Sequence, residues 1–297
     1  MTKWERRQLR NGLLFASPWI IGFCCFALYP LVMSIYYSFT AFNVVQPPVW
    51  IGLANYQELF FEDPLFWTAL YNTLYFTVFS VPLALMFSLT LALLLNQKVP
   101  FMSVFRTVFF LPSIVPIVAS AVLWLWVLNP DSGLINSLLR QWLGIEGPGW
   151  MADARWSKPS LILMSMWSVG GAMVIFLAGL ADVPQTLYEV AELDGAGPVK
   201  KFLHVTLPML TPTILFNMVM GLIMAFQYFT QVYVMTGGSG TPLDSTMFYA
   251  LYLYRNSFYY LRMGYASAMA WMLFIVILGA TLGVLYSSKK WVFYHGD

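Results

Sequence analysis

The sequence predicts an all-α integral membrane protein. Of its 297 residues, 60% are hydrophobic and only 9% are charged, whereas a soluble domain carries roughly 25% charged residues. The mean hydropathy of +0.70 agrees with this composition. Six apolar runs are each long enough to cross a bilayer as a helix, which takes about 20 residues. We therefore expect a multi-pass protein of the cell membrane, with a single transmembrane domain over residues 1–297.

The six expected spans follow from the positions of these runs. None of them contains Asp, Glu, Lys or His, and Arg106 lies at the edge of the third, where its side chain can reach the interface. The first run follows a basic start, but it is too long for the apolar core of a signal peptide, so we expect it to be retained. The expected spans cover residues 13–37, 70–95, 105–127, 160–181, 207–231 and 263–286.

The basic residues predict the orientation of these spans. An even number of spans places both termini on one side, and Lys and Arg are in excess on the cytoplasmic side. With both termini cytoplasmic, ten of the 15 basic residues are inside and five are outside. The ten are Lys3, Arg6, Arg7, Arg10, Lys98, Arg106, Lys200, Lys201, Lys289 and Lys290, and the five are Arg140, Arg155, Lys158, Arg255 and Arg262. This orientation places residues 182–206 in the cytoplasm.

Two outer segments are expected to carry short helices. One is an amphipathic helix near Leu134–Leu143, between two clusters of turn residues. The other is Leu243–Tyr254, which is too short to span a membrane. Either Asp244 or Ser245 is expected to cap its start.

The chain lacks the residues that several functions need. Ion-coupled carriers usually place ionisable side chains within their spans. A chain that binds ATP by itself needs a motif of the form G-x-x-x-x-G-K-S/T. The glycines and lysines of Asp194–Lys201 have the wrong spacing and are typical of a turn. The two histidines, His204 and His295, belong to no cluster suited to catalysis or metal binding. We expect no enzyme, no cofactor bound by this chain and, at a net charge of +2, no nucleic-acid partner.

The polar segment 182–206 interrupts the apolar sequence. Asp182 is expected to cap a helix that has Pro184 in its first turn and ends near Asp194. Asp194-Gly195 is a strong turn signal, after which a second helix starts near Pro198. The first helix exposes acidic residues that an anionic leaflet repels. We therefore expect it to dock on a protein rather than on lipid.

This segment closely resembles the EAA loop of ABC-importer permeases, which couples the permease to a separate ATPase. The pattern E-x-A-x-x-D-G-A, followed by F and L-P, matches at Glu189, Ala191, Asp194, Gly195, Ala196, Phe202, Leu207 and Pro208. The departure is Val190, where the family usually has alanine. Other matches make the whole chain similar to the maltose-type branch of carbohydrate-uptake permeases. They are Pro18–Gly22, Tyr29-Pro30, Gly52–Tyr56, Asn72-Thr73 and Thr236–Gly238.

The resemblance implies a function and a set of partners. The chain would be the permease domain that forms half of a pathway for a sugar or oligosaccharide, in a heterodimer with a second permease. Two ATP-binding-cassette subunits, which bind ATP and Mg²⁺, and an extracellular sugar-binding protein would complete the importer within the lipid membrane. The residues that would couple to the ATPase are Glu189, Ala191, Glu192, Asp194, Gly195 and Ala196.

The fifth expected span carries the candidates for substrate contact. At helical spacing Asn217, Gly221, Met224, Tyr228 and Gln231 share one face, which Gln227 borders. The candidates are Asn217, Gln227, Tyr228 and Gln231, and helix packing is the alternative role for these amides. A polyol or glycerol phosphate as substrate, and a self-sufficient secondary carrier or facilitator, remain alternatives. A phosphate ester needs cations along the pathway; the expected span interiors have none, which favours a neutral sugar.

Overall fold

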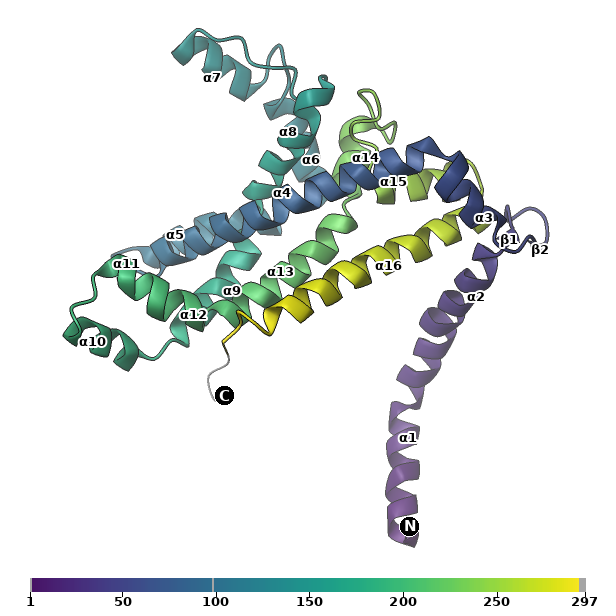
Figure 1. Ribbon diagram of the computed structural model, residues 1–297, viewed down its shortest axis with the longest axis horizontal. Helices are drawn as coiled ribbons and strands as arrows, with labels where there is room; N and C mark the ends of the chain where they lie inside the picture. Colours follow the sequence, from purple (N-terminus) through teal and green to yellow (C-terminus); the bar gives the residue numbers. More distant parts are fainter. Residues whose placement is uncertain (1, 98, 294–297) are drawn as a thin grey trace. The chain divides into compact units, whose positions relative to one another are not determined.

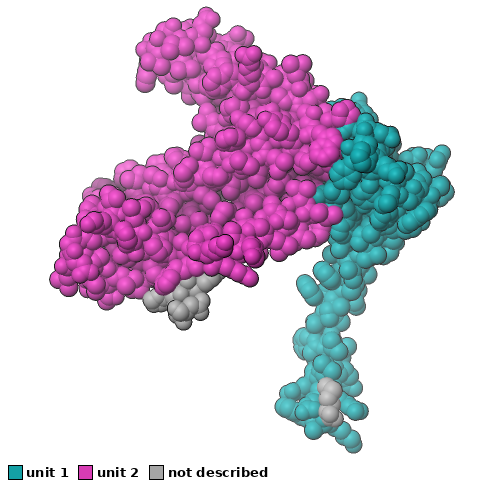
Figure 2. Space-filling view, in the orientation of Figure 1, with its two compact units in different colours: residues 1–63, 253–272 teal, residues 64–252, 273–297 magenta. Residues whose placement is uncertain are grey.

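The computed structural model describes residues 2–97 and 99–293, so Lys98 and His295 lie outside it. The described chain is mostly helical, as expected, and its elements are labelled in Figure 1. It divides into two compact units, shown in Figure 2. Unit 1 comprises residues 1–63 and 253–272, and unit 2 comprises residues 64–252 and 273–297.

Unit 1 begins with a long helical stretch. Helix α1 (Lys3–Phe23) continues through a π-helical turn (Cys24–Leu28) into α2 (Tyr29–Ser38). A reciprocal pair of hydrogen bonds between Thr2 and Glu5 caps α1 and satisfies two backbone N–H groups that have no partner within the helix. The stretch Lys3–Ser38 is long and apolar enough to cross a membrane, and it begins well before the expected residue 13.

A hairpin follows α2 and is fastened by side chains of the Gly52–Tyr56 motif. Strand β1 (Thr40–Ala41) pairs antiparallel with β2 (Val49–Trp50). The buried Asn55 carboxamide donates hydrogen bonds to the carbonyls of Ser38 (2.9 Å) and Thr40 (3.0 Å). Since Asn55 lies on the short helix α3 (Ala54–Gln57), these bonds fix the hairpin to the chain that follows it.

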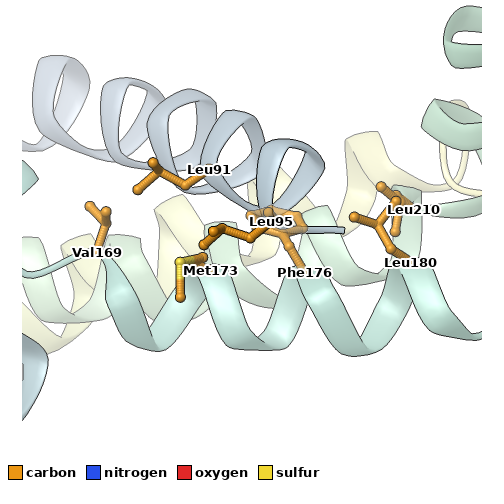
Figure 3. Packing of buried hydrophobic residues seen from close by; sticks show 8 residues of the cluster. Leu91, Leu95, Val169, Met173, Phe176, Leu180 and Leu210 are labelled. Atoms are coloured by element: carbon orange, nitrogen blue, oxygen red, sulfur yellow. The ribbon is translucent and has the colours of Figure 1, made fainter. Parts of the chain in front are cut away.

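Unit 2 is built around helix α4 (Pro64–Leu95), which packs against α8, α9 and α13. The hydrophobic core in Figure 3 joins α4 to α9, with Leu91 and Leu95 of α4 beside the fully buried Met173 and Phe176 of α9. The other helices are α5 (Met102–Phe110), α6 (Ile117–Val127), α7 (Leu134–Leu143), α8 (Ala154–Trp167), α9 (Gly170–Ala181), α10 (Gln185–Leu193), α11 (Pro198–Lys201), α12 (Leu207–Met209), α13 (Thr211–Phe226) and α14 (Thr230–Thr236). Helices α15 (Tyr249–Tyr254) and α16 (Met263–Ser288) contribute to both units.

Four described stretches are long and apolar enough to span a membrane without a sharp bend: Lys3–Ser38, Pro64–Leu95, Thr211–Thr236 and Met263–Ser288. The expected third and fourth spans are instead bent pairs of helices, with angles of 97° and 48°. In the third, Val115 precedes Pro116 and is extended, because proline disfavours helical geometry in the residue before it. In the fourth, Gly170 lies so close to α5 that an added Cβ would be 2.9 Å from the Phe109 carbonyl oxygen.

Two helices begin at positions that differ from the expected bounds in ways that matter for function. Helix α8 begins at Ala154, where Asp153 caps it, six residues before the expected fourth span at residue 160, so Lys158 lies on this helix. The outer helix begins at Tyr249 rather than near Leu243. Leu243 and Asp244 have left-handed φ values of +48° and +54°, so Asp244 belongs to a turn and caps no helix. The expected amphipathic helix Leu134–Leu143 is α7.

Candidate functional site

Helix α10 (Gln185–Leu193) forms the exposed arm of segment 182–206. Pro184 occupies its N-cap position, whereas Asp182 is the C-cap of α9, so the expectation that Asp182 caps α10 is wrong. Proline needs no partner for a backbone N–H, which suits it to the start of a helix. The polar segment therefore holds a separate helix whose N-cap lies two residues after the C-cap of α9.

A Schellman turn ends α10 and explains the spacing of its motif. The N–H of Ala196 donates to the carbonyl of Ala191 (2.9 Å), and the N–H of Gly195 donates to that of Glu192 (3.0 Å). Gly195 has a φ of +74°, which is the left-handed geometry that glycine adopts at low cost. Asp194 is the C-cap. The residues Ala191, Asp194, Gly195 and Ala196 thus together define one sharp turn.

The two glutamates of α10 have different surroundings. Glu192 forms an ion pair with Lys201 of α11, which ties the two sides of the turn together. Glu189 is exposed, and no ion pair or hydrogen bond of its side chain occurs within residues 2–97 and 99–293. The Tyr188 hydroxyl and Thr206 Oγ1 lie 2.9 Å apart, which also fastens α10. A firmly held helix therefore presents one free carboxylate.

Apolar side chains accompany this carboxylate on the surface. Leu187, Val190 and Leu193 of α10 are exposed, and Leu193 has 88% of its surface accessible. Exposed apolar groups next to a charge are typical of a protein contact. Val190, the departure from the family pattern, belongs to this surface rather than to a core, so its extra methyl groups meet no packing constraint within unit 2.

The candidate substrate residues of the fifth span do not lie on one uninterrupted helix. Helix α13 ends at Phe226, and α14 begins at Thr230. Asn217 is buried and its carboxamide donates to the Thr213 carbonyl (3.1 Å). Gln227 is exposed, and Gln231 is half-buried beyond the break. The expected continuous face therefore divides at Gln227.

The break places Tyr228 in an aromatic cluster. Its ring stacks on Phe76 of α4, with 4.3 Å between ring centroids, and lies 5.6 Å from the ring of Phe248. The ring is buried, and its hydroxyl has no hydrogen-bond partner in the described part of the chain. A buried polar group usually has a partner, so this hydroxyl is suited to one from outside the chain, either water or substrate.

The Asn72-Thr73 pair holds the segment before α15. The Asn72 carboxamide donates to the carbonyls of Asp244 (2.8 Å) and Met247 (3.0 Å). Thr73 Oγ1 accepts a hydrogen bond from the N–H of Tyr249 (2.9 Å). Burial raises the pKa of the Tyr249 phenol above its ordinary value, so it stays neutral at physiological pH. Asn72 and Thr73 of α4 therefore fix a turn that is 172 or more positions away in the sequence.

Lys158 is a further residue of interest, which the sequence places in an outer segment without a functional role. Its amine donates to Asn72 Oδ1 (2.9 Å) and lies 5.5 Å from the ring centroids of Tyr71 and Tyr75. The signal that could have revealed it is Asp153, a strong N-cap residue that places the helix start before Lys158. A count of apolar residues alone places the start of the fourth span at residue 160, after Lys158.

Comparison with known proteins gives consistent matches over the whole chain. Residues 81–290 match the family described as binding-protein-dependent transport system inner membrane component. The chain is 42% identical to a probable ABC transporter permease protein, YesP of Bacillus subtilis, over 97% of this chain and 94% of the relative. It is 33% identical to the lactose transport system permease protein LacF of Rhizobium radiobacter, over 94% of each. It also resembles a chain in the crystal structure of a bacterial alginate ABC transporter in complex with alginate pentasaccharide-bound periplasmic protein, with a TM-score of 0.82, 25% identity and 97% of each chain covered.

Proposed function

The chain belongs to the family of binding-protein-dependent transport system inner membrane components, and we propose that it forms half of the pathway of an ATP-driven importer for a sugar or oligosaccharide. The family consists of transport permeases of the inner membrane rather than catalytic enzymes. The relatives named for lactose and alginate support a carbohydrate cargo.

The observation that carries the proposal is the rigid turn at Gly195. It holds α10 with a free carboxylate at Glu189 and exposed leucine and valine side chains, a surface suited to a basic and apolar cleft on an ATPase. In this mechanism, ATP binding closes the ATPase pair, and α10 moves with its ATPase subunit. The pathway then opens outward to receive the sugar, and hydrolysis returns it to the inward-open state.

The proposal includes the surrounding assembly. A second, similar permease completes the pathway, two ATP-binding-cassette subunits bind ATP and Mg²⁺, and an extracellular binding protein delivers the sugar. Counting each bent pair as one span gives six spans, with both termini and segment 182–206 in the cytoplasm. The substrate candidates Gln227 and Tyr228 lie at the break in the fifth span, and broken helices are common at transporter binding sites.

Co-purification tests this proposal. The chain is isolated from its native membrane in mild detergent, the accompanying chains are identified, and ATP-dependent uptake is measured after reconstitution with the binding protein. The expected result is a complex with a second permease and an ATPase that imports a saccharide only when ATP is present. Recovery of the chain alone, with gradient-driven transport, would instead establish the self-sufficient carrier.

A further inference from the structure

Lys158 is a cation on α8, the first helix of a bent pair that is long and apolar enough to span a membrane. The side chain is half-buried on α8, and its amine donates one hydrogen bond, to Asn72 Oδ1 (2.9 Å). No carboxylate of the described residues forms an ion pair with it. Because a lysine amine has three N–H donors, Lys158 retains donors and an unneutralised charge for a further partner.

Aromatic rings surround this amine. Tyr71 and Tyr75 of α4 each place their ring centroid 5.5 Å from Lys158 Nζ, and Tyr75 packs on Phe79 at 4.7 Å between centroids. Tyr71 exposes 60% of its surface. The three rings are four residues apart, so they form a ladder along one face of α4, with the lysine at its Tyr71 end.

The ladder lies on an exposed side of α4, with Tyr71 60% and Phe79 49% accessible. The neighbouring side carries the buried residues Asn72, Thr73 and Phe76, which contact the rest of the unit. A lysine is costly against hydrocarbon, and cations within spans usually face protein or a water-filled path. Lys158 faces protein at Asn72, and its remaining donors lie beside the Tyr71 end of the ladder, where a polar partner from outside unit 2 would offset this cost.

Resting on the proposed function, we propose that Lys158, Tyr71 and Tyr75 form a subsite for the carboxylate of an acidic saccharide. The amine supplies a charge-assisted hydrogen bond to the carboxylate, and the tyrosine rings supply apolar faces for the sugar ring and hydroxyls for its oxygens. The expected fourth span starts at residue 160 and so excludes this cation. The lack of cations in the expected spans favoured a neutral sugar. Because α8 continues past that bound, Lys158 lies two residues before the expected span and offers a cation to an anionic cargo at its end.

Lys158 also has a structural contact, which the test must separate from ligand binding. Its bond to Asn72 Oδ1 orients the carboxamide that holds Asp244 and Met247. The substitution Lys158→Gln keeps an N–H donor but removes the charge. Lys158→Arg keeps the charge, and Arg155→Gln removes a positive charge from an exposed position on the same helix, which makes it the matched control.

The experiment measures ligand binding to the co-purified complex in nanodiscs by saturation-transfer NMR, without the binding protein. Three probes are compared: a tri-uronide, the same trisaccharide with its carboxyl groups reduced to alcohols, and glycerol 3-phosphate. The expected result is that the tri-uronide binds roughly tenfold more tightly than its reduced form, as for one charged hydrogen bond. We expect Lys158→Gln to abolish this preference, and Lys158→Arg and Arg155→Gln to retain it.

Several outcomes would overturn the inference. The inference fails if the two trisaccharides bind equally, or if Lys158→Gln keeps the preference. It also fails if Lys158→Gln weakens both trisaccharides equally. Lys158 would then be a structural tie, a lipid contact or a partner of another subunit. Glycerol 3-phosphate binding as tightly as the tri-uronide would show an anion site without saccharide character. Binding and import of both trisaccharides, each unchanged by Lys158→Gln, would refute this inference alone, whereas failure of the ATPase to co-purify would refute the proposed function.

Discussion

Glu189 and Glu192 are three residues apart on α10, yet they are expected to contribute differently to transport. Glu192 pairs with Lys201 within the chain, while the Glu189 carboxylate is free for another subunit. We expect Glu189→Gln to lower ATP-dependent uptake roughly tenfold, because a hydrogen bond to a charged group contributes about 1.5–3 kcal/mol. Uptake into proteoliposomes, normalised to the amount of complex, provides the measurement.

Glu192→Gln is the matched comparison for this prediction. It removes the same charge from the same helix, but it breaks only an exposed ion pair, which contributes at most about 1 kcal/mol. We expect uptake to change by at most about fivefold, which corresponds to that 1 kcal/mol. A larger loss in Glu192→Gln than in Glu189→Gln would reverse the assignment of the two residues.

Tyr228 offers a second test at the scale of one residue. Its buried hydroxyl has no hydrogen-bond partner among the described residues, so Tyr228→Phe removes an unsatisfied group and keeps the stacking on Phe76. We expect the thermal stability of the complex to be unchanged or slightly higher. If the hydroxyl contacts the sugar, uptake falls severalfold at low substrate and recovers at high substrate.

The control for this change is Tyr286→Phe, which removes a hydroxyl from an exposed ring on α16. It is expected to leave uptake at all substrate concentrations unchanged. Normal uptake in Tyr228→Phe as well would assign Tyr228 to packing alone, and the substrate contacts would then have to lie elsewhere.

Gly195 and Gly197 allow the turn after α10 to be tested as an element. An added Cβ would meet no atom within 4 Å at either position, but only Gly195 has a positive φ. Alanine at Gly195 is expected to cost about 1–2 kcal/mol, because a side chain disfavours left-handed geometry. We therefore expect Gly195→Ala to loosen the turn and reduce coupled uptake, while Gly197→Ala has little effect.

Limited proteolysis between residues 193 and 198 provides a readout of this turn that is independent of transport. Gly195→Ala is expected to speed cleavage there, because opening of a weakened turn exposes the backbone. Equal cleavage rates and equal uptake in the two alanine variants would mean that the left-handed turn is not needed for coupling.

The same turn illustrates what the sequence alone can predict. Asp194-Gly195 is a local signal, because a left-handed position after a helix requires glycine or a few other residues, and the structure has the turn there. The break after Phe226 had no such signal. There, stacking of Tyr228 on Phe76 of α4 depends on a partner roughly 150 residues away in the sequence, and helical periodicity alone predicts a continuous face.

Lys158 shows a different limit of the sequence. Apolar content predicted the existence of the fourth span, but helix boundaries are the least certain part of any such prediction. The Asp153 cap starts α8 six residues before the expected span, so this helix carries Lys158, which the apolar run does not include. The contacts of Asn72-Thr73 with the turn before α15 were likewise beyond local patterns, since they join α4 to residues after Thr236.

At the scale of the whole molecule, the orientation in the membrane depends on whether the broken fifth span crosses it. The excess of basic residues places segment 182–206 inside, and Thr211–Thr236 is long enough to cross despite its break. Leu193 lies before this stretch and Leu243 after it, and they are exposed to nearly the same extent, 88% and 89%. They are therefore matched positions for cysteine labelling.

Leu193→Cys and Leu243→Cys are each introduced into a chain whose exposed Cys24 and Cys25 are replaced by serine, and a membrane-impermeant maleimide is added. In right-side-out vesicles we expect labelling of position 243 and not of 193, and in inverted vesicles the reverse. Labelling of both after detergent is the control for shielding by a partner subunit. Because the two sites are equally exposed, a difference reports the side of the membrane. Labelling of both from the same side would mean that α13 and α14 form a re-entrant segment. If that side is the outer one, α10 would lie out of reach of a cytoplasmic ATPase.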